Sequence, residues 1–154
     1  MPVILALKIY PIMSNKIHSF VYYGKLPSFN EFIEKAKGDR FGAVYRQWKK
    51  EKDEAIAWRI KDQLRGVKIT CNCAMVIRWY SQNRGTDQDN IEAAKKYICD
   101  ALQWAGTIKN DGWKELGGNT LHEHYVDPIN PRIEVYLLEN IKITYPGLPP
   151  VNSK

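Results

Sequence analysis

The chain has 154 residues and a formal net charge of +6, from 23 basic and 17 acidic side chains. Because a domain of this size uses most of its length to enclose one core, we expect a single domain over 1–154, with an N-terminal extension over 1–16 and a loose tail over 146–154. No stretch approaches the roughly 20 apolar residues that cross a bilayer, which predicts a cytoplasmic protein with no membrane partner.

The positive charge favours polyanionic partners, because lysine and arginine neutralise phosphates and release condensed counterions. Three cysteines cannot pair completely, and Cys71 and Cys73 lie in an apolar alternating run. This pattern argues against a disulfide framework, and the incomplete ligand count argues against structural zinc.

The first third of the chain predicts strands followed by helices. Segments 3–10 and 17–23 are rich in β-formers around a turn and predict a hairpin. Ser28 and Glu31 form a capping-box pattern, which predicts a short helix to about Lys37. Apolar residues then recur at helical spacing as far as Leu64 and predict a long second helix.

The clearest strand pattern runs from 67 to 80, where apolar and polar side chains alternate. A polar loop follows and leads to Asp87. Asp89 and Glu92 form a second capping-box pattern, which predicts a third helix over 90–104.

Segments 121–126 and 132–138 predict a terminal hairpin. The expected architecture is therefore α+β, with a mixed sheet packed against two to three helices.

Two acidic residues mark a candidate metal site. If the chain is still extended between Asp87 and Asp89, both carboxylates project to one side and can share a cation. Such hard oxygen ligands suit Mg²⁺, with Mn²⁺ as a substitute, provided that a third acid comes from elsewhere in the chain. As an alternative, the two acids only stabilise a helix start.

Three ordered segments resemble the RusA family of Holliday-junction resolvases. These are Asp87-Gln-Asp89-Asn90, then Asp100-Ala-Leu-Gln-Trp-Ala-Gly106, then Asn110-Asp111. The family has an acidic pair where this chain has Asn110-Asp111, so only the second acid is retained. The resemblance covers roughly residues 17–140.

The resemblance implies a Mg²⁺-dependent endonuclease that resolves four-way DNA junctions in recombination and repair. It implies that Asp87, Asp89 and Asp111 bind the metal and take part in catalysis. It also implies a homodimer, because a junction offers two equivalent strands to two equivalent sites. Branched DNA, chiefly the four-way junction, is the expected partner.

The position of the catalytic lysine differs from that in the family. The family places it four residues after the second aspartate of the motif, where this chain has Ala93. Because the following helix looks about one turn longer, alignment from its C-terminal side points to Lys96. Lys95, or no equivalent lysine, remains an alternative.

Basic residues supply candidate phosphate contacts, although the mixed charges of the long helix also fit a solvated face. The candidates are Lys49, Lys50, Lys52, Arg59, Arg78 and Arg84. Two rival functions stay open: a nuclease for forks or three-way junctions, and a catalytically silent junction binder.

His122-Glu123-His124 looks like a metal motif. In a strand, however, the two histidines share one face, Glu123 faces away and no third ligand is evident. We therefore interpret it as structural.

Overall fold

The computed structural model describes residues 16–38, 42–149 and 151. The predicted strand over 3–10, and with it the pairing of the expected hairpin, lies outside the described residues, whereas the predicted strand over 17–23 is confirmed. The described chain is an α+β fold with a mixed four-stranded sheet, as expected. Its elements are β1 (Ile17–Tyr23), α1 (Phe29–Lys37), α2 (Ala43–Leu64), β2 (Cys73–Ser81), α3 (Gln88–Glu92), α4 (Lys95–Trp104), α5 (Trp113–Leu116), β3 (Thr120–Val126) and β4 (Arg132–Glu139).

The strand order is β1-β4-β2-β3, and it corrects one prediction. Both strands of the expected terminal hairpin form, but they do not pair with each other. Instead β4 pairs antiparallel with β1 and β2, whereas β3 pairs in parallel with β2. Burial explains this order: Val135 and Leu137 of β4 are fully buried, while no residue of β3 is fully buried, which suits an edge strand.

The helices α1 and α2 confirm the sequence prediction. Ser28 caps α1 by accepting a hydrogen bond from the backbone N–H of Glu31, and the Glu31 carboxylate accepts from the N–H of Ser28. The predicted strand over 67–80 begins later, at Cys73. Before it, the N–H of Ile69 donates to the carbonyl of Thr107, so this segment packs on the end of α4 without joining the sheet.

The predicted helix over 90–104 is two helices. A turn at Ala93 and Ala94 separates α3 from α4, and here the N–H of Lys96 donates to the carbonyl of Ala93, three residues back. Such bonds tighten the backbone relative to an α-helix. The direction of the chain can therefore change between the acidic motif and Lys96.

The start of α3 also differs from the prediction. Asp87, not Asp89, is the N-cap residue, so the proposed Asp89–Glu92 capping box is wrong. The chain is extended at Asp87 but helical from Gln88 onward. Because residues two apart in a helix do not face each other, the geometric reason for Asp87 and Asp89 to share a cation no longer holds.

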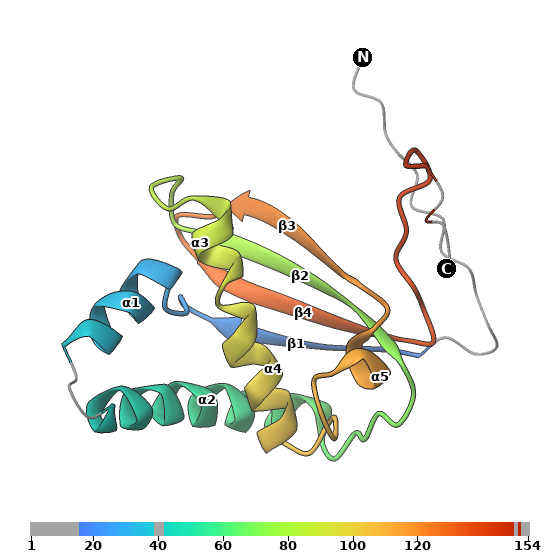
Figure 1. Cartoon of the computed structure of the whole chain (residues 1–154), viewed down its shortest axis with the longest axis horizontal. Helices are drawn as coiled ribbons and strands as arrows, with labels where there is room; N and C mark the ends of the chain where they lie inside the picture. Colours follow the sequence, from blue (N-terminus) through green and yellow to red (C-terminus); the bar gives the residue numbers. More distant parts are fainter. Residues whose placement is uncertain (1–15, 39–41, 150, 152–154) are drawn as a thin grey trace.

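The helices cover one face of the sheet (Figure 1), and the main core lies between them. Ile56 and Ile60 of α2 and Leu102 of α4 pack there against Ile77 of β2 and Leu137 of β4. A smaller cluster on the opposite face contains Ala74, Leu138, Ile141 and Ile143. None of the described helices has the length and apolarity needed to cross a membrane.

The interior position of β4 predicts a contrast between two leucines. Leu137 is fully buried, whereas Leu148 is 68% exposed. We expect Leu137→Ala to lower the free energy of unfolding by about 2–5 kcal/mol, because it leaves a cavity in the core. Leu148→Ala is the matched control and should change it by less than about 0.5 kcal/mol. Similar losses in urea denaturation of the two variants would contradict the observed strand order.

Candidate active site

Two residues singled out from the sequence are in contact. Lys96 lies in the first turn of α4, and its Nζ is 3.3 Å from Oδ2 of Asp111, in the loop before α5. Lys96 is 62% exposed and Asp111 is 29% exposed. The pair therefore joins residues 15 apart in sequence at a surface that solvent and a ligand can reach.

The loop that carries Asp111 is fixed from both sides. On one side, the backbone N–H of Asp111 donates to Oδ1 of Asn110 at 3.0 Å. On the other side, Nδ2 of Asn72 donates to the carbonyls of Trp113 and Lys114, which attaches α5 to the chain entering β2. Asp111 is thus held between the end of α4 and the sheet.

Behind this pair, a chain of alternating charges leads into the protein. Oδ1 of Asp100 lies 2.9 Å from Nζ of Lys96, and Oδ2 of Asp100 lies 2.6 Å from Nζ of Lys49. Lys49 also lies 2.6 Å from Oδ2 of the buried Asp53. The charges connect α2, α4 and the loop before α5.

Burial and ion pairing shift the pKa values of these charged side chains in opposite directions. Burial would raise the pKa of Asp100, but hydrogen bonds from Lys49 and Lys96 outweigh it and hold the pKa below its ordinary value. For Asp53 burial prevails and raises its pKa, and its Oδ1 is buried without a hydrogen-bond partner in the described structure. Burial would lower the pKa of Lys49, yet the hydrogen bonds that it donates to both aspartates raise its pKa. Lys49 and Asp100 are therefore both charged at neutral pH.

The other predicted metal ligands lie at the start of α3. Asp87 and Asp89 are both exposed, and Oδ1 of Asp89 accepts a hydrogen bond from the N–H of Asn90 at 2.9 Å. Across the described part of the chain, no three acidic, histidine or cysteine side chains lie close enough to hold a metal ion. The donor chemistry still fits Mg²⁺, which binds through one or two carboxylates together with water and substrate phosphates.

The two candidate lysines have different partners. Nζ of Lys95 donates to the hydroxyl of Thr120 on β3 at 2.7 Å, whereas Lys96 contacts Asp111 and Asp100. Both side chains line one open hollow together with Asp111. Lys96 is therefore the lysine in contact with a predicted catalytic acid.

The predicted phosphate contacts divide by their surroundings. Lys49 is 22% exposed and holds two carboxylates, so it binds helices together and we remove it from the DNA-contact set. Arg78 donates to Glu123 at 2.7 Å and lies over the ring of Tyr136, and Lys50 pairs with Glu54. Arg59 and Arg84 are exposed and Lys52 is partly exposed. These last three are the better placed of the predicted contacts.

The histidine motif on β3 forms structural contacts, as interpreted from the sequence. Nε2 of His124 lies 2.8 Å from Oε1 of Glu92 on α3, and the indole N–H of Trp79 donates to Nδ1 of His122. Glu123 points to the other face and accepts from Arg78. The sequence placed Glu92 in a capping box and gave no sign of its contact with His124, which attaches α3 to the edge strand.

The ion pairs of Asp100 and Asp53 with the two lysines were also not predicted from the sequence. A signal was present in both cases, because Lys49–Asp53 and Lys96–Asp100 have the four-residue spacing of helical ion pairs. Asp53 also lies three residues before the buried Ile56, on the apolar face of α2. An acid at such a position needs a buried cationic partner.

Comparison with known proteins adds no family to this description. No protein-family model matches the chain, and no curated protein matches it. The resemblance to the RusA family therefore rests on the residues of the motif.

The lowered pKa of Asp100 predicts a pH-dependent effect of removing its charge. We expect Asp100→Asn to lower the free energy of unfolding at about pH 7 by about 1–3 kcal/mol, because two ammonium groups lose their charged partner. A carboxyl with a lowered pKa stabilises the fold above the ordinary aspartate range near 4, and loses this effect as pH falls through the lowered pKa. Urea denaturation at about pH 7 and about pH 3 measures the difference between variant and unmodified protein.

Asp62→Asn is the control for this measurement, because Asp62 is exposed on the same helix as Lys49. It should have little effect at either pH. An equal loss of stability for Asp100→Asn at both values of pH would contradict the assigned role of its charge.

Proposed function

We propose that this protein is a Mg²⁺-dependent, structure-selective DNA endonuclease of the RusA type that cuts four-way junctions. The contact between Lys96 and Asp111 carries the proposal. The motif singles out these two residues from separate segments, and a structural role alone does not require them to meet at an exposed surface. The positive net charge is in keeping with a DNA substrate.

We assign Mg²⁺ binding to Asp87, Asp89 and Asp111. These carboxylates do not form one group in the described structure, so the ion would bind through one or two of them together with water and substrate phosphates. When bound, it activates water and stabilises the charge that develops on the scissile phosphate. Lys96 contributes a positive charge beside Asp111 for the phosphate oxygens. The hydrogen bond that Lys96 donates to Asp100 outweighs the effect of burial and raises the pKa of Lys96, so the ammonium stays protonated. If Asp111 turns to a metal ion, Asp100 still holds Lys96 in place.

Partner binding follows from the same proposal. Lys52, Arg59 and Arg84 are the residues that we expect to neutralise phosphates along the arms of the junction. A twofold homodimer would present two equivalent sites to the two strands that are cut. A preference for forks or three-way junctions is the nearest alternative and is tested with the same substrates.

The second candidate is a junction-binding protein without nuclease activity. The ammonium of Lys96 favours it, because this group already lies 3.3 Å from Asp111 and neutralises the oxygen that a metal ion would bind. The position of Asp89 inside the first turn of α3 favours it as well. The two candidates differ in whether DNA is cut when Mg²⁺ is present.

The test is cleavage of three labelled substrates in Mg²⁺: a four-way junction, a fork and a linear duplex. We expect paired nicks in the junction, with 5′ phosphate and 3′ hydroxyl ends, and little cleavage of the duplex. Asp111→Asn should lower the cleavage rate by at least about 10²-fold and keep junction affinity, because the lost carboxylate acts mainly in the transition state.

Asp62→Asn serves as the matched control, since it removes an exposed carboxylate at another place. It should cut at the unmodified rate. Equal nicking of all three substrates would contradict the proposed selectivity for junctions. Junction binding by the unmodified protein without any nicks would establish the silent binder instead.

A further inference from the structure

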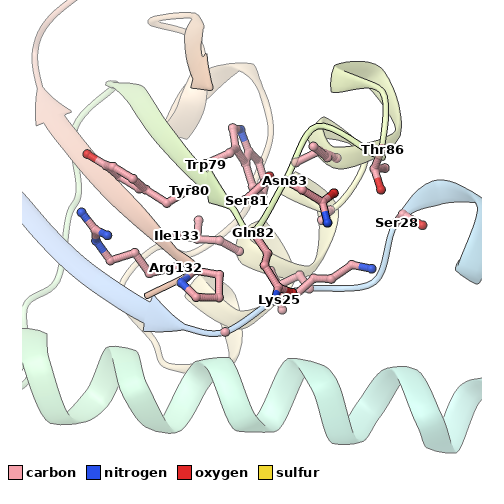
Figure 2. Close-up of a pocket in the computed structure, with 15 residues that line it drawn as sticks. Lys25, Ser28, Trp79, Tyr80, Ser81, Gln82, Asn83, Thr86, Arg132 and Ile133 are labelled. Atoms are coloured by element: carbon pink, nitrogen blue, oxygen red, sulfur yellow. The ribbon is translucent and has the colours of Figure 1, made fainter. Parts of the chain in front are cut away.

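A pocket of about 160 Å³ lies at the end of β2, outside the charged chain. Figure 2 shows how two connecting segments face each other across it, with Asn83 and Thr86 on one side and Lys25 and Ser28 on the other. Ile91 of α3 and Ile133 of β4 also line it.

We propose that this pocket takes a single unstacked DNA base next to the strand that is cut. The inference rests on the proposed function and names a part of the substrate that the acidic site does not bind. It gives the protein a way to recognise the branch point by the unstacking of a base, in addition to phosphate contacts.

The size of the pocket suits one aromatic ring. A cavity of roughly 150 Å³ in a protein core holds one benzene molecule, and this pocket is slightly larger and open to solvent on one side. Its wall includes the apolar side chains of Leu26, Ile91 and Ile133, which suit the faces of a flat base.

The polar side chains suit the edge of a base. Amide and hydroxyl groups donate and accept hydrogen bonds on base edges, and the lining contains them in Ser28, Gln82, Asn83 and Thr86. Oδ1 of Asn83 accepts from the N–H of Gly85 at 2.8 Å. This bond fixes the orientation of the amide and keeps its Nδ2 as a donor.

Two cations lie at the rim of the pocket, and each already has a carboxylate partner: Lys25 lies 3.6 Å from Glu31, and Arg132 pairs with Asp127 and Glu134. Lys25 and Arg132 both line the pocket. Arg132 lies over the ring of Tyr80 at 3.6 Å and donates to Asp127 and Glu134, so its position is held from several sides. A base in the pocket would bring its own phosphate close to these cations.

The place of the pocket in the chain connects it to the proposed active site. Thr86 directly precedes Asp87, and Ile91 and Ala94 lie in α3 and in the turn that leads to Lys96. A base held here would therefore lie beside the backbone that carries the predicted catalytic residues. Base unstacking costs least where pairing is already interrupted, as at a branch point.

The test uses a four-way junction in which 2-aminopurine replaces one base at a time around the crossover. The fluorescence of this base rises when it leaves the stack. With the full chain in EDTA, where no cleavage occurs, we expect a several-fold rise at one position and little change elsewhere. The same positions in linear duplex should show no rise.

Two variants connect the signal to the pocket. Ile91→Phe places a ring in the pocket and Asn83→Ala removes its amide, so each should reduce the rise several-fold. Asn30→Ala, at an exposed position on α1, is the matched control and should give the unmodified signal. Circular dichroism checks that each variant is folded, and Asn83→Ala decides the matter if Ile91→Phe does not fold.

The outcomes separate this inference from the proposed function. Junction cleavage in Mg²⁺ without a fluorescence rise, or with a rise that both pocket variants keep, overturns the base pocket and leaves the nuclease standing. A rise that the pocket variants abolish, without cleavage by the unmodified protein, supports the pocket and refutes the nuclease. Absence of the rise in a protein that also fails to cleave overturns both.

Discussion

Asp100 accepts hydrogen bonds from Lys49 of α2 and Lys96 of α4, and the arrangement of the candidate active site depends on this half-buried carboxylate. Removing charges from water is costly unless each charge is paired with good geometry. Here two lysines alternate with three aspartates, so the ammonium groups of Lys49 and Lys96 each have a carboxylate on both sides. The long helix α2, which contributes no predicted catalytic acid, is thereby coupled to the loop that carries Asp111.

The sheet fixes the other side of the site. β2 lies between β4 and β3, and its end leads through a polar loop into α3. Glu92 of α3 contacts His124 on the edge strand, and Lys95 of α4 contacts Thr120 on the same strand. The end of β2, the short helix α3 and the start of α4 consequently follow one another beside the edge strand β3 (Figure 1).

Local sequence signals predicted those features that depend on neighbours in the chain. The capping box at Ser28 and the long helix α2 depend on the local sequence, and both appear as expected. The order of the strands depends on long-range pairing. A hairpin and the observed separation of β3 from β4 have the same local pattern, so the sequence favoured the simpler connection.

The break at Ala93 and Ala94 was hidden for a similar reason. Both residues are good helix formers, and neither glycine nor proline marks the turn. The contacts of Glu92 and Lys95 with β3 act on either side of it. At the site, the motif led to the prediction of Asp111, and of Lys96 with Lys95 as an alternative, whereas the contribution of Asp100 required knowledge of how α2 packs against α4.

The most direct test of a catalytic centre formed by Lys96 and Asp111 compares single-turnover cleavage of a four-way junction by Lys96→Ala and Lys95→Ala in Mg²⁺. If the proposed function holds, Lys96→Ala slows cleavage by about 10²–10³-fold, because it removes the positive charge that we propose for the scissile phosphate. Lys95→Ala loses only its bond to Thr120 and should cut close to the unmodified rate. An equal loss in both variants, or a loss confined to Lys95→Ala, would contradict the assignment of Lys96 and Asp111 to one catalytic centre.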